Sequence, residues 1–301
     1  MIIAVSGASS SIAKELIAFL ESLNHKIIRI SSSIPRDGKL FFSFEDLRKN
    51  TINCSVDIFF HLASLNTSLN ENNINEEVEL TETTLAAMHS LNCKKLIFFS
   101  TSKIYGANTW SETILFTEDS ILQPICAYGK AKQLCEELIT AKSSELKINA
   151  MILRLPPFIS QSSSSSLARL LKFIKKGIPI PSLNHGELNA RSFISINNIQ
   201  NLIIAILAHK DFTRISNTYN LADEKAISLN KLLKTYGSIF YKRKLIFTLP
   251  RSISSFLVQL PYMQNFLLRL YGNSAIDNSK LKKDLGVKLE TTSASLSIIY
   301  K

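Results

Sequence analysis

The first half of the chain alternates short apolar runs with longer segments of helical periodicity. The apolar runs are MIIAVSG, KIIRIS, KLFFSF, VDIFFHLAS, KKLIFFSTS and INAMILRL. Between them lie amphipathic patterns that predict helices at Ser11–Leu23, at about Glu76–Leu91 and at Pro124–Lys142. Apolar strands that alternate with helices are typical of a parallel sheet covered on both faces. The sequence therefore predicts an α/β fold with a doubly wound parallel sheet, whose ligands bind at the carboxyl ends of the strands.

The pattern changes after the double proline at 156–157, where a Ser-rich stretch precedes an amphipathic helical segment. Further on, residues 191–223 contain another helical pattern and a last short strand, NTYNLAD, which we expect to return to the sheet. We therefore expect a dinucleotide-binding domain at 1–157, with 191–223 returning to it. The segments 158–190 and 224–301 are expected to form a smaller C-terminal lobe that binds the substrate.

Composition excludes several classes of protein. Hydrophobic residues make up 46% of the 301 residues and charged residues 20%, which is typical of a globular chain. The four cysteines lack metal-ligand spacing, so we expect a reduced, cytoplasmic protein without a metal site. No apolar run reaches the roughly 18 residues of a membrane span. The longest candidate, residues 252–272, is interrupted by polar residues and is expected to form a packed helix pair.

The N-terminal sequence bears on secretion, and the net charge bears on the choice of partners. The N-terminus has no basic region before its apolar run, so we do not expect a signal peptide. The net charge of +11 fits a nucleic-acid surface, an anionic membrane face or a site for phosphorylated small molecules. Lysines and arginines are spread along the chain, and no helix-turn-helix or zinc-finger pattern is present. We therefore expect no nucleic-acid partner, and peripheral membrane contact stays open.

The turn after the first predicted strand has the position and composition of a dinucleotide-binding turn. Gly7 keeps the first glycine of that pattern, while Ser10 or Ser11 stands where the middle glycine is expected. Ile12 begins the following helix, and Ala13 at the last position still allows close helix-strand packing. By itself the turn fits a serine-capped helix without a ligand equally well.

The end of the second strand bears on the choice between NAD and NADP. Ser31, followed by Ser32, stands where NAD-binding folds commonly have an acidic residue for the ribose hydroxyls. The missing carboxylate removes repulsion against a 2′-phosphate, and Arg29 and Arg36 lie close by in the sequence. The cofactor is therefore expected to be NAD or NADP, with NADP slightly favoured.

A second motif lies in the third predicted helix, which begins CAYGKAKQLCEEL. Tyr128 and Lys132 are four residues apart and therefore share one helix face. This spacing also arises by chance in ordinary amphipathic helices, in which Tyr128 packs as an aromatic and Lys132 is a solvated charge. The rest of the chain must decide between the two interpretations.

Seven segments occur in one order: FEDLRKN, VDIFFHLAS, IFFSTSKIYG, CAYGKAK, MILRLPP, NARSFISINNI and TYNLAD. In this order the chain resembles the extended short-chain dehydrogenase/reductases, the nucleotide-sugar epimerases, dehydratases and reductases with a Rossmann NAD(P)-binding domain. The resemblance covers nearly the whole length. It also implies a cytoplasmic enzyme and a homodimer through the helix with Tyr128 and its neighbour.

The resemblance implies a role for each matching residue. Asp46 and Leu47 match the pair that contacts adenine, and the loop Leu62, Ala63 and Ser64 matches the one that lines the cofactor. The STSKIYG run places Thr101 at the catalytic Ser/Thr position, and Arg191 in RSF matches the arginine that holds the diphosphate of the sugar nucleotide.

The implied mechanism is acid-base catalysis at a sugar oxygen. Lys132 is expected to lower the pKa of the Tyr128 phenol from near 10 by its positive charge and to bind the nicotinamide ribose. Tyr128 then serves as general acid or base while a hydride moves to or from the carbon. Thr101 orients the oxygen by a hydrogen bond.

The resemblance leaves the reaction open. Dehydratases of this family have an Asp-Glu pair after the catalytic Ser/Thr, and Ser102 and Lys103 stand here. The C-terminal half is most similar to a subgroup of UDP-glucose 4-epimerase-like proteins that includes UDP-4-keto-6-deoxy-N-acetylhexosamine reductases of surface-polysaccharide synthesis. We expect a 4-keto reductase acting on a UDP-linked hexose, with a UDP-glucose or UDP-N-acetylglucosamine 4-epimerase as the alternative.

Several departures from the family pattern bear on cofactor affinity and catalysis. Two glycines of the nucleotide turn are missing, the family's Gly-Pro is Ser160-Gln161, and a common aspartate is Asn198. A non-catalytic dinucleotide-sensing protein on the same fold is therefore a distant alternative.

Overall fold

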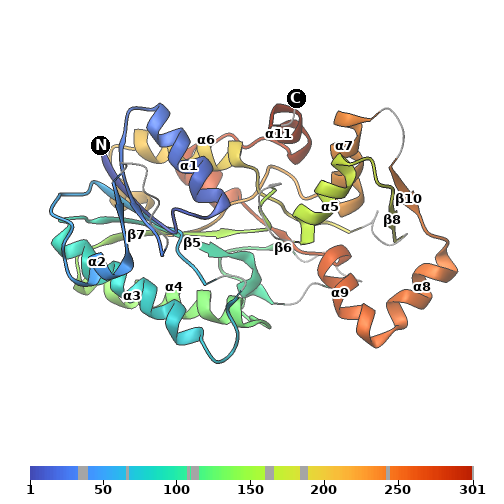
Figure 1. Ribbon diagram of the computed structural model, residues 1–301, viewed down its shortest axis with the longest axis horizontal. Helices are drawn as coiled ribbons and strands as arrows, with labels where there is room; N and C mark the ends of the chain where they lie inside the picture. Colours follow the sequence, from blue (N-terminus) through green and yellow to red (C-terminus); the bar gives the residue numbers. More distant parts are fainter. Residues whose placement is uncertain are drawn as a thin grey trace.

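The computed structural model describes residues 1–32, 40–65, 68–106, 109, 115–159, 166–183, 189–241 and 245–299. A parallel seven-stranded sheet occupies one side of the molecule, with the order β3-β2-β1-β4-β5-β7-β9 (Figure 1). The strands are β1 (Ile2–Ser6), β2 (Lys26–Ile30), β3 (Phe41–Phe42), β4 (Ile58–His61), β5 (Lys95–Thr101), β7 (Asn149–Leu155) and β9 (Thr218–Asn220). The strand order reverses between β1 and β4, so the crevice expected to bind ligand opens beyond the ends of these two strands.

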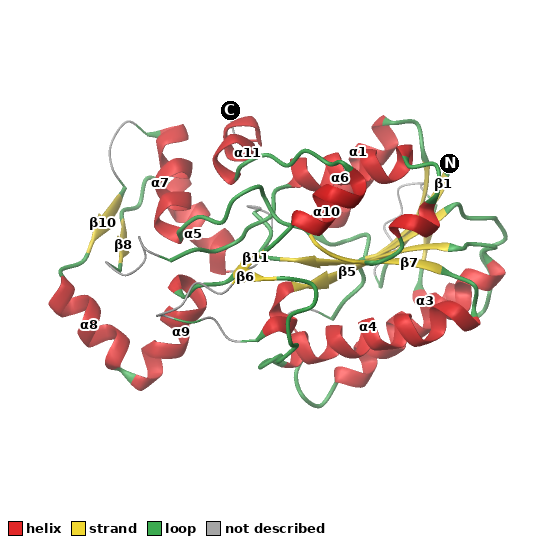
Figure 2. Ribbon diagram, turned by 180° about the vertical axis from the view of Figure 1, so that it is seen from behind, coloured by secondary structure: helices red, strands yellow, loops and turns green. Residues whose placement is uncertain are grey.

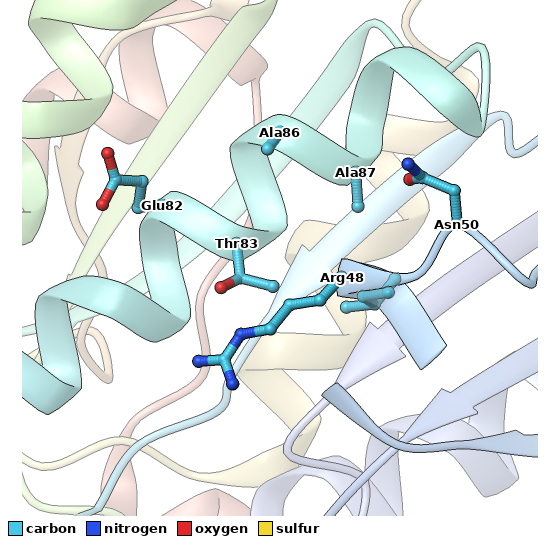
Figure 3. Close-up of a pocket in the computed structure, with 7 residues that line it drawn as sticks. Arg48, Asn50, Glu82, Thr83, Ala86 and Ala87 are labelled. Atoms are coloured by element: carbon cyan, nitrogen blue, oxygen red, sulfur yellow. The ribbon is translucent and has the colours of Figure 1, made fainter. Parts of the chain in front are cut away.

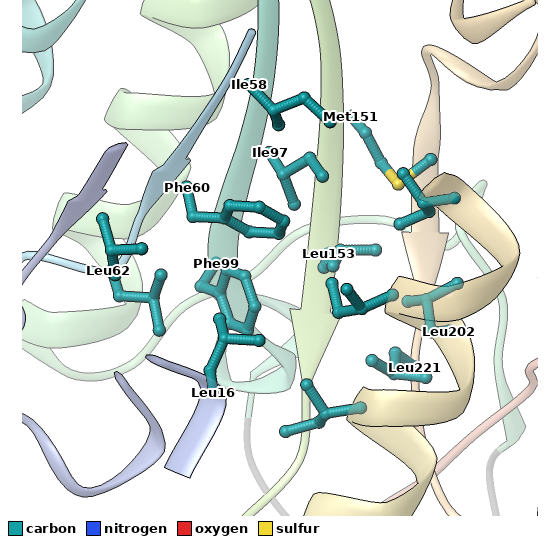
Figure 4. Packing of buried hydrophobic residues seen from close by; sticks show 14 of the residues in the cluster. Leu16, Ile58, Phe60, Leu62, Ile97, Phe99, Met151, Leu153, Leu202 and Leu221 are labelled. Atoms are coloured by element: carbon teal, nitrogen blue, oxygen red, sulfur yellow. The ribbon is translucent and has the colours of Figure 1, made fainter. Parts of the chain in front are cut away.

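Helices cover both faces of the sheet, as Figures 1 and 2 show. One face carries α1 (Ser11–Ser22) and α6 (Ile196–Ala208), and the other carries α2 (Phe44–Arg48), α3 (Ile74–Ser90) and α4 (Ala127–Glu145). Each layer encloses its own apolar core. Figure 4 shows the core under α1 and α6, where alternate residues of β4, β5 and β7 meet Leu16 and Leu202. The predicted doubly wound α/β fold is confirmed.

A second, smaller core lies at the other end of the molecule. It is built from α5 (Ser166–Lys175), β8 (Ile180–Ser182), α7 (Leu229–Phe240), β10 (Ile246–Thr248), α9 (Pro261–Tyr271) and α11 (Thr292–Ile299). Strands β8 and β10 pair in parallel, and so do β6 (Leu115–Phe116) and β11 (Ala275–Ile276). The helix α10 (Ser279–Leu285) and the short η4 (Phe212–Ile215) pack beside the large sheet.

Two expectations about individual segments can be compared with these elements. The segment 252–272 forms a helix pair, α8 (Arg251–Gln259) followed by α9, which confirms the predicted pair. Within the described residues no helix has the length and apolar character needed to cross a membrane. Strand β9 lies beside β7 in the sheet, and the boundaries of the two predicted domains stay a prediction.

The turn between β1 and α1 is packed directly against backbone from the opposite side of the strand-order reversal. Gly7 has a φ of 69°, which favours glycine, and a Cβ there would lie 2.7 Å from the backbone nitrogen of Ala63 and the carbonyl of Leu62. The backbone amide of Ala63 also donates to the Ser6 hydroxyl at 3.3 Å. Gly7 therefore lets the turn after β1 meet the loop after β4, the place where a dinucleotide fold binds its cofactor.

Gly7→Ala should destabilise the protein more than Gly286→Ala does. Both glycines have positive φ, but the site of a Cβ at Gly286 has no heavy atom within 4 Å. Gly286→Ala should therefore lower the free energy of unfolding by only about 1–2 kcal/mol, the cost of placing alanine at a positive φ. Gly7→Ala adds a collision with backbone that cannot rotate away. Urea unfolding of both variants measures the difference, and equal losses would show that the contact with Leu62 and Ala63 is unimportant.

Candidate active site

The site begins where β5 ends. Thr101 is the last residue of β5 and precedes η2 (Ser102–Tyr105), and its hydroxyl accepts the backbone amide of Lys103 at 3.3 Å. The first turn of α4 packs against η2, because Gly129 has no side chain: a Cβ there would lie 2.9 Å from the carbonyl oxygen of Lys103. The fold therefore brings Tyr128, at the start of α4, beside the segment that follows Thr101.

Lys132 is held by a carboxylate from the neighbouring helix. Its Nζ lies 3.0 Å from Oε1 of Glu77 in α3, and both side chains are only 1% exposed. The same ammonium lies 4.7 Å from the ring centroid of Phe98 and 6.0 Å from that of Tyr128. The structure thus places Lys132 beside Tyr128, in a buried ion pair that the sequence analysis did not foresee.

Glu77 joins this pair to the loop expected to line the cofactor. Its second oxygen, Oε2, accepts the backbone amide of Leu65 at 2.7 Å. Leu65 directly follows Leu62, Ala63 and Ser64, of which Leu62 and Ala63 are buried. One carboxylate therefore connects the loop after β4 with the helix that carries Tyr128.

The pKa of Tyr128 shifts opposite to the expected direction. Burial raises the pKa of this phenol, the charge of Lys132 lowers it, and the carboxylate of Glu77 raises it again, so the pKa lies above its ordinary value. Burial lowers the pKa of Lys132, yet Glu77 and Tyr128 oppose that effect and the pKa is raised. Lys132 does lower the pKa of Tyr128, as expected, but burial first and Glu77 second outweigh it, so the expectation of a net pKa below 10 is wrong.

Two further polar residues of this site were not identified from the sequence. His61, at the end of β4, is fully buried, with its Nδ1 2.7 Å from the Ser6 hydroxyl and its Nε2 3.1 Å from the Thr81 hydroxyl. Burial and the nearby Lys132 lower the pKa of His61, so it stays neutral. Lys103 is exposed, and its Nζ lies 5.1 Å from the Tyr128 ring centroid. Their positions at strand ends are visible in the sequence, but their partners come from distant segments.

The turn before α1 presents the amino end of a helix to the crevice. Ser10 is the N-cap residue, and its hydroxyl accepts the amide of Ala13 at 3.2 Å. Ser11 is the first helical residue, and Ile12 packs partly buried against the core. Ser31, at the end of β2, is buried and donates to the Ser9 hydroxyl at 3.2 Å, while Ser32 is exposed. These residues lie together around the first turn of α1.

The structure describes one of the two arginines expected near a 2′-phosphate. The Arg29 guanidinium is buried, forms an ion pair with Glu21 of α1 and donates to the Ile27 carbonyl. It is therefore committed to α1. Arg36 lies outside the described residues, as do Ser160 and Gln161.

The pair expected to contact adenine lies in α2. The Asp46 carboxylate accepts both the backbone amide and the hydroxyl of Ser43, at 2.6 Å and 2.7 Å, and closes a capping box. These hydrogen bonds hold its pKa below the ordinary value. Leu47 is buried in the core under α2 and α3. The carboxylate of Asp46 is thus used to begin α2, and a contact with adenine stays a prediction.

Arg191 lies on a different segment, which bridges to the C-terminal part of the chain. Its backbone exchanges hydrogen bonds with Ile227, and its guanidinium donates to the carbonyl of Gly272 at 2.7 Å. Among the described residues no carboxylate forms an ion pair with it, and burial lowers the pKa of Arg191 to about 10. A buried guanidinium that has no acidic partner in the described part of the chain is suited to an anionic ligand.

A surface pocket between α2 and α3 is not the active site. Figure 3 shows it lined by Arg48, Asn50 and Glu82, together with small residues of α3, and its volume is about 270 Å³. None of its lining residues lies at the carboxyl end of a sheet strand. It shares only Leu47 with the residues expected to bind the cofactor.

Lys132→Met should destabilise the protein by about 3–5 kcal/mol, because it leaves the buried Glu77 carboxylate without its cation. The double variant Lys132→Met/Glu77→Gln removes both charges and keeps an oxygen for the Leu65 amide, so it should recover most of this loss. Urea unfolding gives the free energies of unfolding of the wild type, of Lys132→Met, of Glu77→Gln and of the double variant, which together form a double-mutant cycle. Losses that simply add would contradict a coupled ion pair.

The sequence was also compared with known proteins. A curated UDP-glucose 4-epimerase from Vibrio cholerae is 25% identical over 195 residues, which are 65% of this chain and 58% of that protein. An uncharacterized protein of Sinorhizobium fredii is 24% identical over 159 residues, 52% of this chain and 43% of that protein. The matched part of the chain thus spans about half the length of these curated relatives.

Solved structures give the same fold over nearly the whole chain. The UDP-N-acetylglucosamine 4-epimerase from Bacillus cereus superimposes with a TM-score of 0.79 at 18% identity, covering 100% of this chain and 98% of that one. The UDP-glucuronic acid 4-epimerase from Bacillus cereus in complex with NAD has a TM-score of 0.75 at 20% identity and covers 99% and 94%. The profile of the NAD dependent epimerase/dehydratase family matches residues 3–222. Since this match covers most of the chain, the protein belongs to the NAD dependent epimerase/dehydratase family.

Proposed function

We propose that the protein is an NAD(P)-dependent oxidoreductase that acts at C4 of a nucleotide-activated hexose, most simply as a 4-keto reductase of a UDP-linked sugar. One observation carries the proposal. Tyr128, Lys132 and the segment after Thr101 lie together next to β5, while the turn with Gly7 and the loop after β4 meet at the reversal of strand order. A proton-transfer group thus stands in the same crevice region as a dinucleotide-type turn.

The residues of the chain fit a dinucleotide. Gly7 lets the turn after β1 pack against the backbone of Leu62 and Ala63, and the amino end of α1 offers backbone amides and a favourable dipole to a diphosphate. When bound, the nicotinamide supplies or accepts a hydride. The preference for NADP rests on the missing carboxylate at Ser31 and Ser32, since Arg29 is committed to Glu21.

Tyr128 gives the substrate oxygen its proton in this proposal. Reduction of a 4-keto group adds a hydride to C4 and a proton to the oxygen, so the carbonyl becomes an alcohol while NADPH or NADH is oxidised. The Tyr128 phenol, with its raised pKa, holds that proton at neutral pH. The Thr101 hydroxyl at the end of β5 orients the oxygen by a hydrogen bond, and the Lys132 ammonium lies 6.0 Å from the centroid of the Tyr128 ring.

The proposed substrate class rests on Arg191 and on the relatives. A buried guanidinium with no carboxylate in the described structure can hold a diphosphate by two parallel hydrogen bonds. The relatives named above act on UDP-glucose, UDP-N-acetylglucosamine and UDP-glucuronic acid, which supports a UDP-linked hexose here.

A 4-epimerase is the second candidate, because each of these named relatives is an epimerase. An epimerase returns the hydride to the same sugar and must retain its cofactor through the cycle. The serine and the alanine that replace two glycines in the turn after β1 are expected to weaken cofactor retention, which favours a reductase with an exchanging cofactor.

The proposed reaction predicts oxidation of NADPH or NADH when the enzyme receives a UDP-4-keto-6-deoxy-N-acetylhexosamine. The oxidation is followed as loss of absorbance.

Tyr128→Phe removes only the phenolic oxygen and keeps the packed ring. The variant should therefore lose roughly 10²- to 10⁴-fold in turnover and keep its fold and cofactor binding. A Phe variant that turns over near the wild-type rate would exclude Tyr128 as the proton donor.

A parallel assay separates the two candidate reactions. UDP-glucose or UDP-N-acetylglucosamine is supplied without added cofactor, and the C4 epimer is sought by chromatography. Epimer formation by enzyme that keeps NAD through gel filtration, without oxidation of NADPH or NADH in the first assay, would establish the epimerase instead.

Arg191→Lys should weaken binding of UDP-sugars far more than binding of NAD or NADP. Lysine can reproduce the single hydrogen bond to the Gly272 carbonyl, but it cannot offer a planar fork to a diphosphate. Calorimetry with UDP and with the dinucleotide on the same variant measures both affinities. Unchanged affinity for UDP would show that Arg191 only ties its segment to the C-terminal lobe.

A further inference from the structure

The ion pair between Glu77 and Lys132 is buried beside Tyr128. Both side chains are 1% exposed, and their charged atoms are 3.0 Å apart. A buried ion pair contributes little net stability compared with apolar residues of similar size. Its position beside Tyr128, with the Lys132 ammonium 6.0 Å from the ring centroid, suggests that it acts on the phenol.

We propose that Glu77 is a positioning residue that keeps the Tyr128–Lys132 pair fully protonated, so that the site is set to give a proton to the substrate oxygen rather than to take one. The proposal rests on the proposed 4-keto reduction and explains how its proton donor is maintained. A lone Lys132 ammonium would favour the phenolate of Tyr128. With Glu77 in contact, Lys132 and Glu77 together carry no net charge. The preference for the phenolate form of Tyr128 is therefore largely cancelled.

The other groups around the pair do not replace Glu77. The thiols of Cys126, the N-cap residue of α4, and of Cys135 lie near it, and so does His61 of β4. The Nζ of Lys103, in η2, lies 5.1 Å from the Tyr128 ring centroid. Burial raises the pKa of Cys135 and lowers that of His61, so both are neutral near pH 7. Glu77 is therefore the negative charge in contact with the Lys132 ammonium within the described structure.

The geometry also links this charge to the cofactor loop. Oε1 of Glu77 contacts Lys132, while Oε2 accepts the Leu65 amide at 2.7 Å. The carboxylate is thus fixed from both sides, and it cannot turn away from Lys132 without releasing the loop that follows Ser64. Glutamine at this position would keep an oxygen for the amide and remove only the charge.

Glu77→Gln tests the proposal, with Glu76→Gln as the matched control, since Glu76 is one residue away on the exposed side of α3. Proteins labelled with ¹³C at tyrosine Cζ and lysine Cε are titrated by NMR, and the signals are assigned by their loss in Tyr128→Phe and Lys132→Met. The pair should lose its first proton at lower pH in Glu77→Gln than in the wild type. Glu76→Gln should match the wild type.

The rate of 4-keto reduction gives a second readout. Reduction needs the proton of Tyr128, so the rate falls as pH rises through the loss of that proton. The alkaline limb of the pH profile should therefore move to lower pH in Glu77→Gln and stay in place in Glu76→Gln. Glu77→Asp keeps the charge, so its alkaline limb should lie closer to the pH of the wild-type limb than that of Glu77→Gln does. If Glu77 had a purely structural role, the pH of the limb would not depend on the charge at this position.

Two results would overturn the proposal. One is a Tyr128–Lys132 pair that loses its first proton in Glu77→Gln at the same pH as the wild type or higher. The other is an unmoved alkaline limb with a lower rate at every pH. If Glu77→Gln does not fold, the same comparison is made with Glu77→Asn, a second neutral replacement. The NMR titration needs no turnover, so failure of the proposed reaction and failure of this inference are distinguishable.

Discussion

The buried contact between Glu77 and Lys132 joins the three parts of the molecule that must meet for the proposed chemistry. It connects α3 to α4, and through the Leu65 amide it connects both to the loop after β4. This loop in turn packs against Gly7, so the turn after β1 and the helix with Tyr128 are held by a continuous set of contacts. Because the charges are desolvated, these contacts depend on accurate geometry in a way that apolar packing does not.

A second buried carboxylate fixes the same helix from the next turn. Glu136, four residues after Lys132, accepts three hydrogen bonds from the Arg154 guanidinium of β7, at 2.7 to 3.2 Å, and one from the Ser100 hydroxyl of β5. Arg154 also donates to the Tyr105 hydroxyl of η2, which donates to Asn220 of β9 at 2.7 Å. The helix is thus tied to β5, β7, η2 and β9, and Tyr128 is positioned by buried polar contacts on one helix face.

The sequence predicts much of the fold because its signals are local. Continuous apolar strands and amphipathic helices identify the doubly wound sheet, and the spacing of Tyr128 and Lys132 places both on one face of α4. Glu77 could not be found in the same way, since an acidic residue in an amphipathic helix reads as a solvated charge until the tertiary contact is known. The direction of the Tyr128 pKa depends first on burial and then on that contact, and neither can be read from the sequence alone.

The departure from the family pattern at Asn198 is matched to its buried surroundings. Its Nδ2 donates to the Asp223 carboxylate at 2.7 Å and to the Glu290 carbonyl at 2.9 Å, while its Oδ1 accepts the Glu290 amide at 2.8 Å. An aspartate at 198 could not donate, and it would oppose the buried charge of Asp223. Asp223 supplies the carboxylate from the segment after β9, and the amide ties α6 to the chain before α11. Asparagine at 198 thus meets both the donor and the acceptor that its buried position requires.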